Sequence, residues 1–363
     1  MLIIRVSQRV PPLPGGKELH VVRLSRAQAA SGHNVMICYQ RGDAPQGIKS
    51  LRLRDPVPGW SARGLIGELA FSFRSALQIF RVTRDADVLH LHGDIGLVPL
   101  ALASRSRATA LTLHASLNRR VAWAYRWLHR AFNVIFCIGM SAADALHAAG
   151  VPSSKVCALN SGVVDLFLED PGWQPPGRAH RRVACVGSMV EFKNHRQVIA
   201  ALQLLRSEFE IELVIAGEGP LRAALESQAR DAEIALTLRG LISPVEIRAV
   251  LAESDVFVLP SRRTSTSGEG IATALLEALA FGIPCIVSDE ADPRPAIADV
   301  SAYLSFDSRS TKDLADKLRA VLTSSDVAER LSSNGRRAGR RNSWPEIERI
   351  VSSRLETASS RSR

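Results

Sequence analysis

The sequence is poor in paired cysteines, long apolar runs and clustered metal ligands. Its five cysteines lie singly in apolar, strand-like surroundings, with no close pair and no His/Cys cluster. This spacing excludes a disulfide framework and a structural zinc site, and it is typical of small core residues in a reducing compartment. Because no apolar run reaches membrane-spanning length without a charge, the pattern predicts no transmembrane helix.

The N-terminus also lacks a secretory signal, since MLIIRVSQRVPP becomes polar too early. We therefore expect a cytoplasmic protein. Apolar residues make up 46% of the chain and charged residues 23%, as in ordinary soluble globular proteins. A chain of 363 residues is too long for one ordinary core, so two domains are expected.

Positive charge is unevenly distributed. Residues 1–165 hold 20 Lys and Arg against 9 Asp and Glu, a balance of +11, whereas the remainder stands at −1. A basic half attracts nucleic acid, an anionic membrane surface or a phosphorylated substrate, and a solubilising arginine surface explains the same count. No nucleic-acid-binding module or aromatic RNA-binding motif is apparent, so no nucleic-acid partner is expected.

Strand-like and helix-like segments alternate along the chain. Residues 2–7 predict a strand, residues 17–32 a helix ended by Gly32, and residues 33–39 the next strand. The alternation restarts after residues 169–182, which are rich in Pro, Gly and charge. It is typical of an α/β protein with two doubly wound, mostly parallel sheets.

The predicted boundaries follow from this alternation. We expect a Rossmann-like N-terminal domain, a linker, a second Rossmann-like domain, a final helix with the capping-box sequence Ser343-Trp344-Pro345-Glu346, and a frayed tail. Their ranges are 1–168, 169–182, 183–341, 342–358 and 359–363.

The most informative stretch is EGIATALLEALAFGIPCIVSD, residues 269–289. If Ile271 begins a helix, its free N–H groups favour a phosphate near Glu269. Glu277 then lies roughly 9 Å further along the axis. That distance suits a nucleotide diphosphate sugar, with its sugar at Glu269 and its ribose at Glu277. An amphipathic helix with two solvated glutamates explains the same spacing.

Further candidate residues fall where predicted strands end. Parallel sheets bind ligands outside the carboxyl ends of their strands, so two facing sheets predict a cleft between the domains. The residues at such positions are Gly15, Gly16, His114, Lys193, Gly217 to Pro220 and Glu269.

With these motifs in this order, the chain resembles the retaining glycosyltransferases of family 4, which have the two-domain GT-B fold. The resemblance covers nearly the whole chain. It rests on PGGKELHVVRLSRAQAASGHNV, DVLHLHG, LTLHA, CIGMSAADALHAAGVPSSKVCALNSGVVDLF, VGSMVEFKNH, LVIAGEGPLR, RGLISPVEIRAVLAESDVFVLPS and EGIATALLEALAFGIPCIVSD. It implies an acceptor-binding first domain, a nucleotide-sugar-binding second domain and a closing helix, with Trp344, that crosses back to the first.

The resemblance also implies residue roles. Glu269 contacts the donor sugar, and the backbone of Gly270, Ile271 and Ala272 holds sugar and phosphate. Glu277 binds the ribose hydroxyls.

In the same way, Lys193 neutralises the diphosphate, where leaving-group charge grows. Gly15 and Gly16 form a glycine loop whose backbone approaches phosphate. His114 reaches the donor sugar from the first domain.

Two positions depart from the family pattern. Ser188 stands where the family commonly has an arginine, so either Arg239, Arg262 or Arg263 substitutes as the second diphosphate partner of Lys193, or turnover is weak. Residues 290–295, EADPRP, replace a glycine pair and an acid, which alters the anion-binding loop.

The reaction implied is a front-side substitution in which the departing phosphate oxygen takes the acceptor proton. Paired carboxylates across the sugar are then unnecessary. We expect no metal and no cofactor besides the UDP- or GDP-linked substrate. Asp85-Ala86-Asp87 resembles a metal-binding Asp-x-Asp motif, but we interpret it as the start of a strand. No carboxylate near His90 and His92 in sequence completes a metal site.

The acceptor is expected to be a sugar or a lipid-linked sugar in bacterial polysaccharide or glycoconjugate assembly. Residues 59–84 and 119–132 mix Arg with Trp, Phe, Tyr and Leu at helical spacing. Such helices rest on anionic lipid, which suggests peripheral attachment to the inner face of the membrane. Core aromatics with solvated arginines explain the same pattern.

Two other functions fit the sequence. A GT-B protein without turnover would hold nucleotide or nucleic acid, and a sugar-nucleotide epimerase on the same fold would convert the donor without an acceptor. A phosphorylase is disfavoured because the chain is short.

Overall fold

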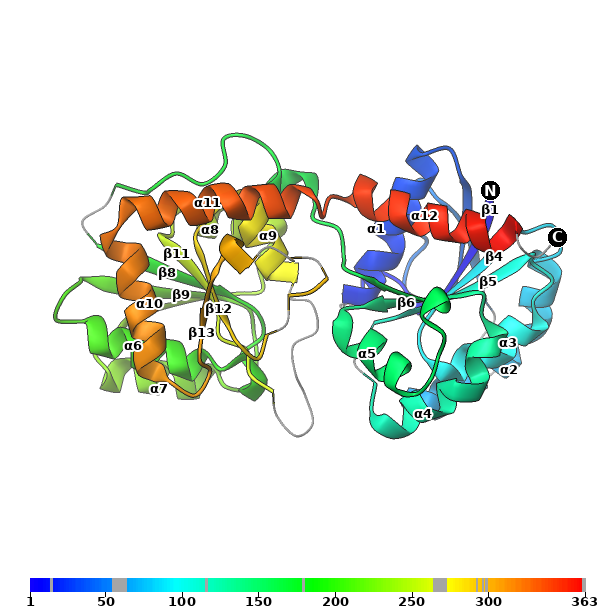
Figure 1. The fold of residues 1–363 in the computed structure, drawn as a ribbon, viewed down its shortest axis with the longest axis horizontal. Helices are drawn as coiled ribbons and strands as arrows, with labels where there is room; N and C mark the ends of the chain where they lie inside the picture. Colours follow the sequence, from blue (N-terminus) through cyan, green and yellow to red (C-terminus); the bar gives the residue numbers. More distant parts are fainter. Residues whose placement is uncertain are drawn as a thin grey trace. The chain divides into compact units, whose positions relative to one another are not determined.

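A computed structural model describes residues 1–13, 16–53, 64–114, 117–177, 180–263, 273–291, 293–295, 297 and 300–360. The chain forms two compact units (Figure 1). One comprises Met1–Gly162 with Trp344–Arg363, and the other comprises Val163–Ser343. The predictions for Gly15, Glu269, Gly270, Ile271 and Ala272 lie outside the described residues.

The first unit is built on a seven-stranded parallel sheet in the order β3-β2-β1-β4-β5-β6-β7. Its central strands are buried on both faces, as parallel strands covered by helices are. The strands are β1 (Leu2–Arg9), β2 (Asn34–Arg41), β3 (Lys49–Arg52), β4 (Val88–His92), β5 (Ala108–Leu113), β6 (Val134–Ile138) and β7 (Val156–Leu159). The helices are α1 (Gly16–Ala30), α2 (Gly64–Val82), α3 (Val98–Ala103), α4 (Arg119–Leu128), α5 (Met140–Ala148) and α12 (Trp344–Ser360).

The second unit has a six-stranded parallel sheet in the order β10-β9-β8-β11-β12-β13. Its strands are β8 (Arg181–Val186), β9 (Ile211–Ala216), β10 (Ala235–Gly240), β11 (Val256–Leu259), β12 (Cys285–Ser288) and β13 (Leu304–Phe306). Helix α10 packs against α6, and α11 packs against α9 (Figure 1). The helices are α6 (His195–Leu205), α7 (Arg222–Asp231), α8 (Pro244–Ala252), α9 (Thr273–Phe281), α10 (Thr311–Thr323) and α11 (Ser325–Arg340).

Both strand orders reverse once, between β1 and β4 in the first unit and between β8 and β11 in the second. Ligands of doubly wound sheets bind outside the carboxyl ends of the strands at such a reversal. The predicted fold class, two doubly wound α/β units, is confirmed.

The last helix, α12, belongs to the first unit. Trp344, Ile347, Val351 and Leu355 are buried against the sheet that contains Ile3, within one apolar cluster. A β-carbon at Gly162 would lie 2.6 Å from the Trp344 ring, so the glycine makes room for this side chain. The prediction that the closing helix returns to the N-terminal domain is confirmed.

The structural division lies at Gly162–Val163, whereas the sequence places the end of the first domain at residue 168. Trp173, inside the predicted linker 169–182, is buried in the core of the second unit. Its indole N–H donates a hydrogen bond of 2.7 Å to the carbonyl of Ser254. Part of the predicted linker therefore packs in the core of the second unit. The prediction missed this because Trp173 is a single large apolar residue in a segment rich in Pro and Gly.

All five cysteines are free and buried, as predicted. Burial raises the pKa of Cys38 and of Cys137 to about 12, so these thiols stay protonated. Among the helices that the structure describes, none has the length and hydropathy of a membrane span.

Candidate active site

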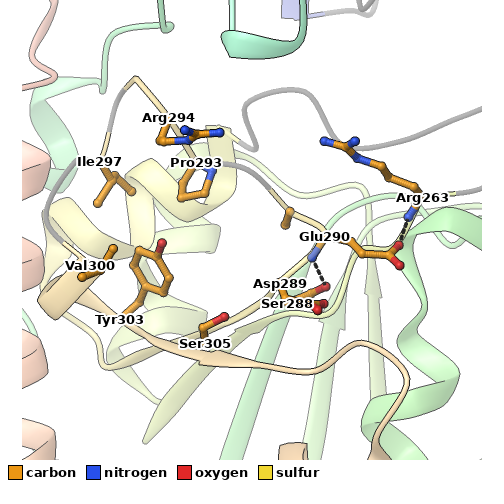
Figure 2. A pocket seen from close by; sticks show the side chains of 11 residues that line it. Arg263, Ser288, Asp289, Glu290, Pro293, Arg294, Ile297, Val300, Tyr303 and Ser305 are labelled. Atoms are coloured by element: carbon orange, nitrogen blue, oxygen red, sulfur yellow. Dashed lines mark hydrogen bonds between the residues drawn. The ribbon is translucent and has the colours of Figure 1, made fainter.

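Three strand-end loops of the second unit are joined by hydrogen bonds. The backbone N–H of Arg262, after β11, donates to the carbonyl of Phe192, after β8, at 2.8 Å. The backbone N–H of Arg263 donates to Glu290 Oε2, after β12, at 2.5 Å (Figure 2). The loops after β8, β11 and β12 therefore form one edge at the reversal of strand order.

Lys193 ends a short 3-10 helix, η5 (Glu191–Lys193), in the loop after β8. It is part-buried, and its ammonium group lies 5.4 Å from the centre of the Phe192 ring. Its side chain passes over Gly187, where an added β-carbon would lie 3.4 Å from Lys193 Cε. Ser188, in the same loop, is exposed. The chain therefore places a cation in the loop after β8, five residues after the serine that stands where the family commonly has an arginine.

Gly217 and Gly219, after β9, serve close packing of two loops. A β-carbon at Gly217 would lie 2.0 Å from the Gly187 carbonyl oxygen, and one at Gly219 would lie 2.4 Å from that of Met189. Gly217 also has a φ of +148°, which disfavours other residues. These glycines hold the β9 loop against the β8 loop, in agreement with the interpretation that they are not a dinucleotide-binding motif.

Glu277 is buried within α9, with 8% of its surface exposed. This excludes the alternative of two solvated glutamates, at least for this residue. Helix α9 is described from Thr273, so its predicted start at Ile271 lies outside the described residues.

The three arginines proposed to replace the missing one lie in different places. Arg262 and Arg263 are on the loop joined to the Lys193 loop, and the Arg262 guanidinium donates to Glu191 at 3.1 Å. Arg239 is exposed on the edge strand β10. Its charge acts on Glu246 at the start of α8, where hydrogen bonds from Ser243 and this charge lower the pKa of Glu246. Of the three, the hydrogen bonds therefore connect only the loop of Arg262 and Arg263 to the loop of Lys193 among the described residues.

A cavity of 590 Å³ opens beside this edge (Figure 2). Its wall includes Arg263, Arg294, Asp289 and Glu290, so residues of the EADPRP loop line it. Burial raises the pKa of Asp289, but hydrogen bonds from Ser308 and Glu290 and the charge of Arg309 outweigh this and bring it below its usual range. The cavity thus combines fixed negative charge with two arginines that reach over its rim.

A second cavity, of 850 Å³, shares Arg263 and Glu290 and adds Arg196, Arg262 and Arg309. The sequence did not single out Arg196 and Arg309. Arg196 is the second residue of α6, and Arg309 follows β13. Ligands of parallel sheets bind near such strand ends, and this position was the only feature of the sequence that could have indicated the two arginines.

In the first unit, His114 follows β5 and joins a cluster of histidines. Its Nε2 lies 3.0 Å from His92 Nδ1, and its ring lies 5.1 Å from that of His20, edge to face. His90 and His92 rings are 4.4 Å apart. The alternation of His90 and His92 on β4 indicated a shared face, but nothing in the sequence brought His20 of α1 to it.

The clustered histidines are neutral near pH 7. Burial, followed by the electrostatic interactions with His20 and with Lys17, lowers the pKa of His114 well below its ordinary range. Burial also lowers the pKa of His92. The ring of His114 therefore offers a hydrogen bond rather than a charge.

Gly16 is the first residue of α1, the helix that contributes His20 to this cluster. No atom of the described chain lies within 4 Å of a β-carbon added there. The fold itself does not require glycine at this position, which leaves room for the backbone to approach a ligand.

A pair of acids adjoins the end of β4. Glu68 of α2 accepts a hydrogen bond of 3.0 Å from the backbone N–H of Asp94, and Tyr125 donates to Asp94 Oδ1 at 3.0 Å. Burial, opposed by the charge of Lys17, raises the pKa of Glu68 to about 7. The sequence did not point to this pair, since Glu68 and Tyr125 come from helices predicted only for their apolar faces.

Asp87 has a structural role. Its carboxylate accepts from the backbone N–H of Leu2 at 2.8 Å and lies 3.4 Å from Arg107. This agrees with the interpretation of Asp85-Ala86-Asp87 as a strand entrance. Within the described ranges, no three His, Cys, Asp or Glu side chains are arranged to hold a metal ion.

Two known families each match a part of this chain. The family described as Glycosyltransferase Family 4 matches residues 14–165, and the family described as Glycosyl transferases group 1 matches residues 177–338. The chain is a family 4-type GT-B glycosyltransferase.

Relatives of this glycosyltransferase include curated proteins and solved structures. It is 29% identical to the putative glycosyltransferase EpsF of Bacillus subtilis, over 55% of this chain and 57% of that protein. It is 25% identical to a phosphatidyl-myo-inositol mannosyltransferase of Mycobacterium leprae, over 92% of this chain and 90% of that protein. The structure of Anabaena HepE in complex with UDP superposes with a TM-score of 0.79 at 15% identity, covering 98% of this chain and all of the other.

Proposed function

We propose that this glycosyltransferase moves a sugar from a nucleotide diphosphate sugar to a hydroxyl acceptor, with retention of configuration and without a metal ion. The observation that carries the proposal is the junction of the loops after β8, β11 and β12, which gathers Lys193, Arg262 and Arg263 at a reversal of strand order. A departing diphosphate gains negative charge, and cations held on such loops stabilise it.

Each residue has a proposed task. Lys193 and Arg262 bind the diphosphate, and the buried Glu277 binds the ribose. His114 orients the donor sugar. Gly16, which has no side chain, lets its own backbone approach the phosphate. The tasks of Glu269, Gly270, Ile271 and Ala272 remain predictions from the resemblance, as does that of Gly15.

The proposed step is a front-side substitution. The bond between the anomeric carbon and the phosphate oxygen breaks, and the bond to the acceptor oxygen forms on the same face. The acceptor proton passes to the departing phosphate oxygen, so no carboxylate needs to act as the base. The protein then contributes orientation and charge stabilisation.

The donor is proposed to be a UDP- or GDP-sugar. The complex of HepE with UDP supports a uridine nucleotide in a related fold.

The acceptor is proposed to be lipid-linked and reached at an anionic membrane surface, within polysaccharide or glycoconjugate assembly. The Mycobacterium leprae relative, which is named for phosphatidyl-myo-inositol, supports a lipid acceptor. The exposed side chains of α2 support a surface that receives it. Ile66, Phe73, Leu77 and Phe80 are exposed by 68%, 70%, 59% and 44% and recur at one helical face.

Helix α4 carries further exposed aromatic side chains. Trp123 and Trp127, one turn apart, are exposed by 61% and 54%. The guanidinium groups of Arg126 and Arg130 lie 5.9 Å and 5.4 Å from the Trp127 ring. Helices α2, α3 and α4 lie on the same side of the first unit (Figure 1). Exposed aromatics flanked by arginines suit the interface of an anionic bilayer.

The alternative, that these aromatics are core, holds only for some of them. Phe71, Tyr125 and Phe132 are buried, whereas Phe73 and the two tryptophans are not. The helices therefore have one face in the core and one apolar face toward solvent.

Thermal-shift measurements with UDP-, GDP- and ADP-sugars, in the presence of EDTA, test the donor site. We expect one nucleotide class to stabilise the protein, and we expect Lys193→Ala and Glu277→Ala to abolish that shift. Lys317→Ala and Glu329→Ala on α10 and α11 are the controls. Equal shifts in all four variants would show the site assignment to be wrong.

Product analysis separates the rival functions. NMR of the glycoside is expected to show the anomeric configuration of the donor. Conversion of the donor without an acceptor would identify an epimerase. Salt-sensitive binding to random oligonucleotides without any turnover would identify a binding protein instead.

Flotation with vesicles tests the membrane surface. We expect the protein to float with anionic but not with neutral vesicles, and Phe73→Ser with Trp127→Ser to lower the bound fraction at least about tenfold. The matched control is Leu204→Ser with Val245→Ser, which removes two exposed apolar side chains of the second unit. Flotation of both double variants at the wild-type level would reject the surface.

A further inference from the structure

His92 and His114 form a hydrogen bond whose direction the structure determines. His92 Nδ1 lies 3.0 Å from His114 Nε2, and both rings are neutral because burial lowers the pKa of each. Between two neutral imidazoles, one nitrogen must carry the proton and the other must accept it. The position of the second nitrogen of His92 decides between the two arrangements.

That second nitrogen, His92 Nε2, is buried and has no hydrogen-bond partner among the described residues. A buried N–H without an acceptor is more costly and rarer than a buried lone pair without a donor. His92 therefore carries its proton on Nδ1 and donates it to His114 Nε2. Since His114 Nε2 then accepts, His114 must carry its own proton on Nδ1.

The neighbouring histidine on β4 has the opposite arrangement. His90 Nδ1 lies 3.4 Å from Arg5, whose guanidinium can only donate, and His90 Nε2 lies 2.7 Å from Thr112 Oγ1. His90 is therefore protonated on Nε2. Two histidines on one strand thus carry their protons on different nitrogens, each set by its partner.

The cluster is also held from its other side. The His20 ring contacts that of His114 edge to face, and the Trp344 ring of α12 lies 5.3 Å from His20. His20 Nδ1 lies 3.1 Å from Ser161 Oγ. These contacts restrict rotation of the His114 ring, so its hydrogen-bonding pattern is preformed.

We propose that His92 is a positioning residue that fixes His114 as the Nδ1–H tautomer, so that His114 presents a hydrogen-bond donor to a hydroxyl oxygen of the donor sugar. The inference rests on the proposed function for its ligand, but the tautomer itself is a property of the protein alone. A donor held in one orientation acts on the sugar without losing rotational freedom when the sugar binds.

NMR of the full chain with ¹⁵N-labelled histidine tests the tautomer directly. The chain has nine histidines, and loss of signals in His114→Gln and His92→Asn assigns the two rings. We expect long-range ¹H–¹⁵N spectra of the wild type to show His114 and His92 protonated on Nδ1 and His90 protonated on Nε2. A His114 ring protonated on Nε2 in the wild type overturns the proposal.

Two variants of His92 separate positioning from packing. Asparagine places an amide N–H where His92 Nδ1–H lies, whereas leucine fills the space without a donor. We expect His92→Leu to shift His114 toward the Nε2–H form and to lower kcat about tenfold to a hundredfold, with the KM for the acceptor and the affinity for UDP or GDP unchanged. His92→Asn is expected to retain the tautomer and most of kcat. An unchanged tautomer in His92→Leu overturns the proposal.

The tautomer of His114 and the proposed function are tested by separate outcomes. If His92→Leu does not fold, the wild-type spectrum still decides the tautomer. If the wild type shows Nδ1–H His114 but transfers no sugar to any acceptor, the proposed function is rejected while the role of His92 in setting the tautomer stands.

Discussion

Arg262 donates a hydrogen bond of 3.1 Å to the carboxylate of Glu191, a residue 71 positions earlier in the chain. The contact joins the loop after β11 to the loop that carries Lys193. It therefore brings a second cationic side chain to the loop of Lys193, although Ser188 occupies the position where the family commonly has an arginine. We propose that Arg262 supplies the charge that the arginine absent at position 188 would carry.

If Arg262 serves the diphosphate, its removal weakens nucleotide binding. We expect Arg262→Ala to raise the Kd for UDP or GDP about tenfold, close to 1.4 kcal/mol. Glu191→Gln is the matched change, and it should leave the Kd within about twofold, because the backbone bond from Arg262 to Phe192 still holds the loop. Calorimetric titration measures both. A larger effect from Glu191→Gln than from Arg262→Ala would mean that the pair matters only for loop structure.

Gly162→Ala is expected to destabilise the first unit. Its new methyl group would lie 2.6 Å to 2.9 Å from three atoms of the buried Trp344 ring. Overpacking of this kind costs about 1 to 3 kcal/mol. Differential scanning calorimetry is expected to show a lower Tm for this unit, whereas Gly16→Ala, with open space around the new methyl, keeps or raises it. Equal Tm values for Gly162→Ala and the wild type would contradict this packing.

The histidine cluster predicts acid sensitivity. Burial lowers the pKa of His20 to about 3 and that of His90 well below its usual range. The unfolded chain therefore binds protons below pH 6.5 that the folded protein does not, and stability falls as the pH drops from there toward 4. Each such group contributes about 1.4 kcal/mol per pH unit.

His20→Asn tests this origin, because asparagine does not titrate and still donates to Ser161. The loss of Tm between pH 6.5 and pH 5 should be smaller in this variant, and it should be unchanged in the control His147→Asn on the surface of α5. Identical acid profiles for all three proteins would argue against the cluster as the cause.

For Glu68 we expect the opposite dependence of stability on pH. Its pKa is raised by burial to about 7, above its unfolded value, so the folded state keeps a proton that the unfolded state has lost. Its contribution is complete at low pH and declines as the pH rises from about 4.5 to 7, by about 3 kcal/mol in total. Glu68→Gln should therefore gain stability relative to the wild type between pH 5 and pH 8 in urea unfolding. Parallel curves, as expected for the control Glu329→Gln, would contradict the raised pKa.

The fold class was predictable from local pattern. Alternating apolar strands such as residues 2–7 and a helix ended by Gly32 repeat along the chain, and short-range periodicity is what separates a parallel α/β protein from other classes. The return of α12 to the first unit was predictable only through the resemblance. No feature of the sequence around Trp344 indicates that this side chain packs against Gly162.

The candidate site was predictable in part. Lys193 and Glu277 were predicted as site residues from motif order, and that role stays a prediction, but the burial of Glu277 excludes the solvated alternative for this residue. Arg262 was one of three candidate substitutes until the hydrogen bond to Phe192 distinguished it from Arg239. Glu68 was missed because its raised pKa comes from burial beside Asp94, a neighbour 26 residues away.

The sequence by itself determined the α/β class, the two domains and the order of the family's motifs, since these depend on residue types and their spacing. Tertiary structure alone decided which side chains meet. His20, His92 and His114 lie on three separate elements, and their protonation depends on burial and on the nitrogen that each neighbour presents. Both are properties of packing in three dimensions, which no spacing along the chain encodes.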